Sequence, residues 1–170
     1  NIIESKWKDK GEKIDSIIKA LSLDEENIIY ATSIASFMPN KYIQFITSKG
    51  GIKRSSLDKF QTNYSKLQAL KLKDTEEVIN VTILDEEERK EFIQFETEEG
   101  LNFNLEVPRI EDSPRNILPT VMFNLSSKDK IVKVEYIESM EFLDFNIGIT
   151  SKNNIKAFNT IKRIPGDKAK

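Results

Sequence analysis

The chain has 170 residues, of which 38% are hydrophobic and 32% are charged, with 26 Lys and Arg against 28 Asp and Glu. This composition supports a packed core, and the lack of any apolar stretch near 18 residues excludes a membrane-spanning helix. Cysteine and histidine are absent, which excludes disulfides, most zinc sites and His-dependent acid–base or nucleophile chemistry.

The net charge of −2 bears on possible partners. A dedicated nucleic-acid binder is usually basic, so this charge counts against strong DNA binding, although a local basic stripe is compatible with it. The chain starts at Asn1 with neither an initiator Met nor a signal peptide. We therefore expect a piece of a longer protein.

The first element in chain order lies within residues 8–23. Apolar residues at Ile14, Ile17, Ile18 and Leu21 fit one amphipathic helix. Gly11 and the repeated element that begins at residue 20 favour a loop followed by a strand. We therefore expect loop and strand here.

A hairpin motif then occurs three times. Residues 42–50 (YIQFITSKG) recur as residues 92–100 (FIQFETEEG), 50 positions later, and more loosely as residues 147–156, 53 positions further on. Gly ends the first two copies, and Asn takes its place in the third. Both residues tolerate a positive φ, so the same turn is expected in all three.

A second element repeats with the same period. Short apolar runs at 20–23, 69–72 and 123–125 are each followed by a polar turn and a β-branched run, at 28–31, 78–81 and 131–134. This pattern predicts strand, turn and strand.

Together the two elements give units of about 50 residues with roughly four short strands each, which is typical of a propeller blade. We predict an all-β fold of about three to four blades that pack on one another. The expected divisions are a partial blade at 1–35, blades at 36–86 and 87–139, and a partial blade at 140–170. The alternative is a mixed β domain whose repeats are accidental.

Three segments resemble the C-terminal pinwheel repeats of bacterial type IIA topoisomerase A subunits. They are residues 7–11 (WKDKG), residues 45–60, which contain the Lys53-Arg54 pair, and residues 64–72 (YSKLQALKL). The resemblance is nearer to topoisomerase IV, whose A subunits in Gram-positive bacteria have a segment like residues 7–11, than to gyrase. The Gln-Arg-Arg-Gly-Gly-Lys-Gly box of gyrase has no match here, which argues against full gyrase-type wrapping of DNA. It also departs from the family in the next repeat, where residues 101–104 (LNFN) replace the basic pair.

The resemblance implies a non-catalytic domain that binds and bends duplex DNA on a basic rim, guiding segment capture and supercoil preference. The catalytic tyrosine, ATP and Mg²⁺ would belong to other parts of an ATP-dependent parent enzyme, so no cofactor and no catalytic residue are expected here. Expected partners are DNA, the ATPase B subunit of the parent enzyme and the catalytic core to which this domain is joined, with no membrane. The expected location is the bacterial cytoplasm, at the nucleoid.

The candidate DNA contacts are cations in the hairpins and the loops after them, where they would neutralise phosphates without reading base sequence. They are Lys49, Lys53, Arg54, Lys59, Lys66, Lys152, Lys156 and Arg115. The alternative for each is a solvated charged turn. Glu111 and Asp112, which lie between Arg109 and Arg115, would oppose a polyanion.

Other features receive structural interpretations. Residues 50–56 lack the spacing of a phosphate-binding loop. The acidic runs 85–88 and 96–99 lack the alternating ligands of a calcium loop and are interpreted as solvated edges. Trp7 is expected to pack on a neighbouring blade. The alternative function is a propeller-type platform for protein interactions with weak or lost DNA binding.

Overall fold

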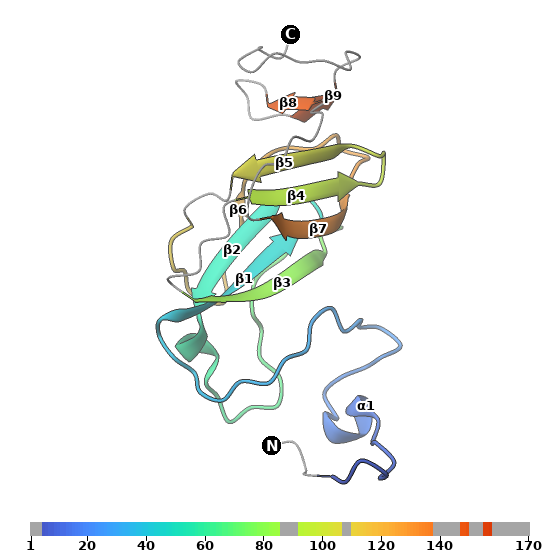
Figure 1. Cartoon of the computed structure of the whole chain (residues 1–170), viewed down its shortest axis with the longest axis vertical. Coiled ribbons are helices and arrows are strands. Elements are labelled where there is room, and N and C mark those ends of the chain that lie inside the picture. The colour runs from blue at the N-terminus through green and yellow to red at the C-terminus, as the bar shows by residue number, and fades with distance from the viewer. Residues whose placement is uncertain (1–4, 86–91, 107–109, 138–146, 150–154, 158–170) are drawn as a thin grey trace.

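The computed structural model describes residues 5–85, 92–106, 110–137, 147–149 and 155–157. Its elements are a one-turn helix, a 3-10 helix and nine strands, and this confirms the all-β class (Figure 1). In chain order they are α1 (Ile14–Ile17), β1 (Lys41–Thr47), β2 (Gly51–Ser56), η1 (Leu57–Phe60), β3 (Val78–Asp85), β4 (Phe92–Thr97), β5 (Asn102–Glu106), β6 (Thr120–Val121), β7 (Ile131–Ile137), β8 (Ile147–Ile149) and β9 (Ile155–Ala157).

The first sheet has four antiparallel strands in the order β3-β1-β2-β6. Its long strands are rich in β-branched and aromatic residues, which suit a pleated and partly buried surface. Phe45 lies opposite Lys53, and Ile46 lies opposite Ile52. Because side chains alternate along a strand, these two pairs point to opposite faces.

The second sheet repeats this arrangement with β5-β4-β7, and β8 and β9 form a two-stranded ribbon. Gly50 and Gly100 both have a positive φ, of 81° and 85°. In each turn the glycine N–H donates to the carbonyl of the threonine that ends the preceding strand, Thr47 or Thr97. The 50-residue sequence repeat is therefore also a structural repeat.

The core lies between the first two sheets. Ile46 and Ile52 of the first sheet pack with Ile93, Phe95 and residues of the second. Phe123, just after β6, meets Phe95 and Phe103 edge-on, each at 5.1 Å between ring centroids. The apolar face of one sheet thus covers the aromatic face of the next, as expected of stacked blades.

The repeated strand-turn-strand element was only partly predicted correctly. The segments 20–23, 28–31 and 69–72 are not strands, and residues 5–40 contain only the short helix α1. At the third copy, the strand is β6 rather than 123–125, and it pairs with β2 of the preceding repeat. A strand requires a neighbour for its backbone groups, and local β-propensity does not supply one.

The blade limits at 86/87 and 139/140 lie outside the described residues and remain predictions. A search of the described part of the chain finds no helix with the length and apolar character needed to cross a membrane.

Candidate nucleic-acid interface

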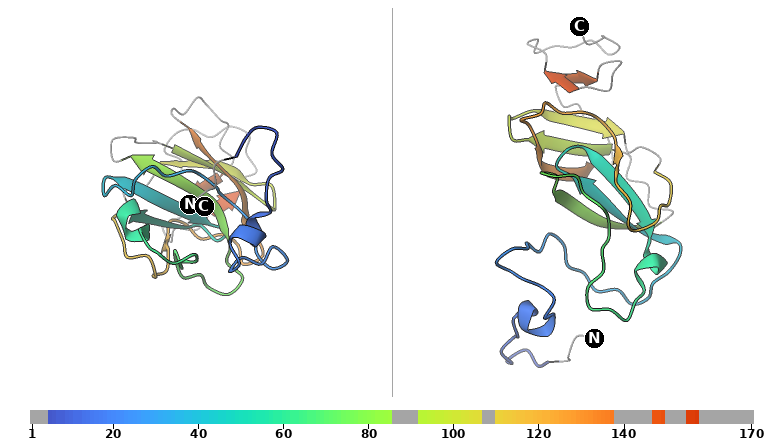
Figure 2. Two further views of the ribbon diagram at one scale, coloured as in Figure 1. Left: turned by 90° about the horizontal axis from the view of Figure 1, so that it is seen from below. Right: turned by 180° about the vertical axis from the view of Figure 1, so that it is seen from behind.

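The candidate site forms where the segment after residue 110 attaches to β2 on the side away from β1, next to the short pairing with β6. Ser113 donates from its backbone N and its Oγ to the carbonyl oxygen of Arg54, at 3.0 and 2.8 Å. The backbone N–H of Ser56 donates to Asp112 Oδ1 at 2.7 Å. Figure 2 shows this gold segment running beside β2. Residues far apart in the sequence therefore meet along one strand edge.

Three of the predicted cations gather here, and we call Lys53, Lys59 and Arg115 the basic corner. Lys59 Nζ lies 2.7 Å from Asp112 Oδ2 and 3.3 Å from the Ser113 carbonyl oxygen. The Arg115 guanidinium lies 6.0 Å from the centre of the Phe60 ring. The charges of Lys59, Asp112 and Arg115 all act on Lys53, and Asp112 pairs directly with Lys59, so three positive groups and one carboxylate share this corner.

Lys53 is the buried member of the basic corner. Its exposed fraction is 2%, its Nζ donates to Ser55 Oγ at 2.5 Å, and it lies 5.7 Å from the centre of the Phe45 ring. Burial, assisted by the charge of Lys59, lowers its pKa to about 8. Lys53 faces Phe45 as Phe103 faces Phe95 in the second sheet. It therefore occupies a core-type position and is covered from solvent rather than presented to a phosphate.

Asp112 remains ionised at this corner. Burial alone would raise its pKa, but hydrogen bonds from Lys59 and from the Ser56 N–H outweigh that effect, and the pKa is lowered. Asp112 was expected to oppose a polyanion. The structure shows in addition that its carboxylate is hydrogen-bonded into the cluster.

Arg54 points to the other face of β2. Its guanidinium carbon lies 3.6 Å from the centre of the Tyr42 ring, in cation–π geometry. Its Nε is buried and has no hydrogen-bond partner within the described chain. Lys53 and Arg54 are neighbours in sequence, but their side chains lie on opposite faces of β2 because side chains alternate along a strand.

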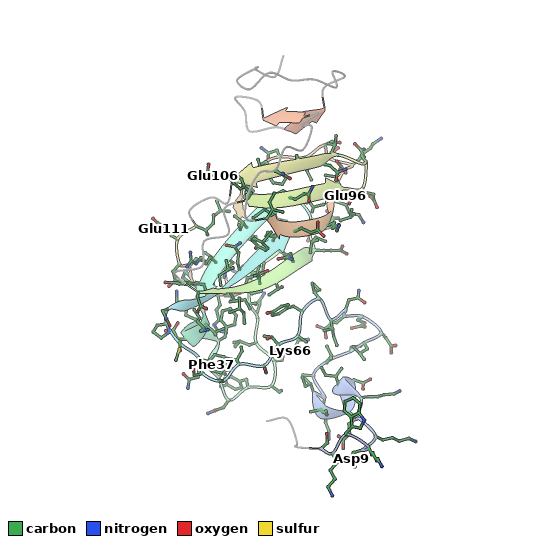
Figure 3. The ribbon with its side chains drawn as sticks, in the orientation of Figure 1. Asp9, Phe37, Lys66, Glu96, Glu106 and Glu111 are labelled. Atoms are coloured by element: carbon green, nitrogen blue, oxygen red, sulfur yellow. The ribbon has the colours of Figure 1, made fainter. Side chains whose placement is uncertain are left out.

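Lys49 and Lys66 lie away from the basic corner. Lys49 Nζ donates to the carbonyl oxygens of Ser127 and Asp129, at 3.4 and 2.6 Å, and so ties the first hairpin to the second sheet. Lys66, labelled in Figure 3, pairs with Glu26 at 2.8 Å. Both cations already have partners within the chain.

The predicted site in the last repeat is only partly visible. Lys156 lies in β9 opposite Gly148 of β8, and its side chain is outside the described set. Lys152 falls between the described ranges. Their role as DNA contacts stays a prediction.

The second sheet contrasts with the first in charge. Its face away from the core has a depression of about 70 Å³ lined by polar and charged residues, namely Gln94, Glu96, Asn102, Lys133 and Glu135. Small-molecule sites usually enclose several hundred Å³. Figure 3 shows Glu96 at one end of this sheet and Glu106 at the other. This blade is therefore a poor surface for a polyanion.

Trp7 was predicted to pack on a neighbouring blade, and this is wrong for the described residues, since its side chain is 100% exposed. The segment around it is held by local contacts such as the bond from the Lys6 N–H to Asp9 Oδ2 at 2.7 Å. Local bonds of this kind fix a turn without providing an apolar surface to cover the indole.

Sequence reasoning did not identify the Ser56 N–H or the Tyr42 ring as parts of the site. A backbone donor carries no sequence signal, because every residue except proline has one. The position of Tyr42, two residues before the partner of Arg54 in the hairpin register, could have indicated the ring contact.

Comparison of the sequence with those of known proteins gives one relative and no family. No family model matches the chain. The A subunit of DNA topoisomerase 4 from Bacillus subtilis (strain 168) is 35% identical over 85 residues, which is 48% of this chain and 10% of that protein. The chain therefore spans about a tenth of this relative's length.

Two solved structures share the fold. The C-terminal domain of DNA topoisomerase IV matches with a TM-score of 0.69 and 27% identity, over 79% of this chain and 41% of that one. The DNA gyrase A C-terminal domain matches with a TM-score of 0.56 and 21% identity, over 75% and 41%. The gyrase likeness shows the fold alone. Motifs, relative and solved structures agree, and they confirm that this chain resembles part of the C-terminal pinwheel domain of bacterial type IIA topoisomerase A subunits.

Proposed function

We propose that this chain is a non-catalytic duplex-DNA-binding domain that contacts backbone phosphates without reading base sequence. The observation that carries the proposal is the gathering of Lys53, Lys59 and Arg115 at the β2 edge of a fold shared with the topoisomerase IV C-terminal domain. Cations grouped in this way neutralise phosphates and release counterions, which favours binding at low salt.

The cations divide into two functional groups. Lys59 and Arg115 are partly exposed and can approach a phosphate, whereas Lys53 is covered and adds only to the local positive potential. Contacts to backbone oxygens place a protein on the duplex but carry no direct sequence information. We therefore expect similar affinity for duplexes of unrelated sequence.

Bending of DNA by this chain alone should be weak. Bending 20–30 base pairs costs about 1–6 kcal/mol, which must come from contacts along the bent segment. The basic corner lies beside one sheet only, and the neighbouring sheet carries Glu96 and Glu135 around the depression on its outer face. If the parent enzyme uses this domain to guide segment capture and supercoil preference, further blades would therefore have to contact the DNA.

The test is fluorescence anisotropy with a 30-base-pair duplex across 50 to 200 mM salt. With two or three phosphates contacted, affinity should fall by about 10- to 40-fold over this range. The double substitution Lys59→Ala/Arg115→Ala should weaken binding and reduce the salt slope by about two. A substituted protein that binds with the same slope as the wild type would refute these two residues as contacts.

The matched control removes two cations elsewhere. Lys128 lies in the turn before β7, and Lys133 lies on β7 of the acidic sheet. Lys128→Ala/Lys133→Ala changes the net charge equally but should leave the slope within experimental error. Equal effects of both double substitutions would indicate dependence on net charge alone.

A second function is favoured by a different observation. Lys49 and Lys66 are engaged within the chain, while the segment before β1 exposes apolar side chains such as Trp7, Ile17 and Ile28. These features favour a platform for protein interactions. No measurable DNA binding at 50 mM salt would support this alternative over the first proposal.

In the parent protein we propose that the domain works with the ATPase B subunit as well as with the catalytic core to which it is joined. Those parts would use ATP and Mg²⁺, and this domain would hold no cofactor. Within the described residues, no group of three or more acidic side chains is arranged to hold a metal ion.

A further inference from the structure

We propose that the basic corner contains a phosphate site that the carboxylate of Asp112 occupies when DNA is absent, so that Asp112 competes with bound DNA. This inference rests on the proposed function and identifies how its site is regulated.

The donor set suits an anion with several oxygens. The Ser56 N–H approaches Asp112 Oδ1, and Lys59 Nζ approaches Oδ2, both at 2.7 Å. A backbone N–H and an ammonium group are the donors that commonly hold phosphate oxygens in protein–DNA contacts. A phosphodiester at this place could accept both bonds without movement of β2 or η1.

The charge balance favours exchange of the anion. Asp112 supplies one negative charge to Lys53, Lys59 and Arg115, so the corner keeps excess positive charge. The side chains of Lys59 and Asp112 are 33% and 38% exposed. Ion pairs this exposed hold together weakly, so a polyanion can displace the carboxylate.

The attachment of the Asp112 segment limits what must move. Ser113 holds the segment through two bonds to the Arg54 carbonyl oxygen, and neither bond involves the carboxylate. The Asp112 side chain can therefore rotate away while the backbone stays on the β2 edge. Exchange needs a side-chain rotation and no unfolding of the segment.

Asp112→Asn is the decisive substitution, because the amide oxygen can still accept the Ser56 N–H while the charge is removed. Glu111→Gln is its matched control, since it removes the same charge from the preceding residue. Glu111 is exposed and forms no side-chain hydrogen bond or ion pair within the described residues.

The experiment measures binding of a 30-base-pair duplex by wild type and both variants at several salt concentrations. Asp112→Asn should bind about 3- to 10-fold more tightly at 50 mM salt, with a salt slope steeper by about one. Glu111→Gln should change affinity by less than about 2-fold. Equal affinities of the two variants, or weaker binding by Asp112→Asn, would overturn the inference.

A second measurement needs no variant and guards against misfolding of Asp112→Asn. The backbone amide resonance of Ser56 in the wild-type chain should shift during titration with the same duplex, because its acceptor changes from carboxylate to phosphate. Binding of DNA with the Ser56 amide and Asp112 carboxyl resonances unmoved would refute the exchange.

The outcomes separate the two proposals. If the wild type binds in a salt-dependent way but the two variants behave alike, only the role of Asp112 is wrong. If no protein binds, both proposals fail. If only Asp112→Asn binds, the inference is supported and the wild-type site is closed under those conditions.

Discussion

Substitution of Gly50 by alanine tests whether the first hairpin is fixed by contact with Phe123, which follows β6. A methyl group on Gly50 would lie 2.7 Å from the Phe123 carbonyl oxygen and 2.8 Å from its ring. Gly100, in the equivalent turn, has a nearly identical positive φ but nothing within 4 Å of such a methyl group. The two glycines differ in their surroundings and share their backbone conformation.

This difference separates two contributions to the free energy of unfolding. A positive φ costs an alanine about 1–2 kcal/mol at either position. At Gly50 the methyl group also meets Phe123, which is fully buried and held edge-on by two further rings. Overpacking of this kind adds about 1–3 kcal/mol. Gly50→Ala should therefore lose about 2–5 kcal/mol, and Gly100→Ala about 1–2 kcal/mol.

Urea unfolding followed by circular dichroism gives the free energies, and thermal melts provide a check. An excess loss of 1–3 kcal/mol at Gly50 corresponds to a Tm lower by about 2–12 °C than that of Gly100→Ala. Equal losses for the two variants would refute the idea that packing against Phe123 fixes the hairpin.

Two further predictions concern buried polar groups. Lys53→Met removes a buried charge and should raise stability by about 1–3 kcal/mol below pH 8. The folded-state pKa of Lys53 is about 8, below the ordinary 10.5. Between these pH values the unfolded chain binds more protons, so wild-type stability rises with pH and the advantage of the variant disappears. Urea midpoints at pH 7, 8.5 and 10 measure this, and an advantage constant with pH would contradict it. Tyr136→Phe removes a hydroxyl that accepts a bond from Gln44 Nε2 at 2.7 Å between the two sheets, and should cost about 1–2 kcal/mol. The control Tyr64→Phe alters a ring that is 80% exposed and should change stability by less than about 0.5 kcal/mol, so equal effects would argue against a bond between the sheets.

The sequence by itself determined the repeated hairpins. Apolar and β-branched residues on both sides of Gly50 and Gly100 specify two strands and a turn that needs positive φ, and these are local properties. The period of about 50 residues then indicated stacked blades. The motifs that resemble the topoisomerase family are likewise contained in short segments.

Only the tertiary structure decided how the blades are completed and where the cations lie. β6 joins the sheet of the preceding repeat, and Asp112 reaches Lys59 from 53 positions away. Lys53 and Arg54 are neighbours in sequence, yet one is buried against Phe45 and the other stacks on Tyr42. Backbone pairing and burial depend on groups distant in the chain, so local sequence predicts the hairpin but not the exposure of its cations.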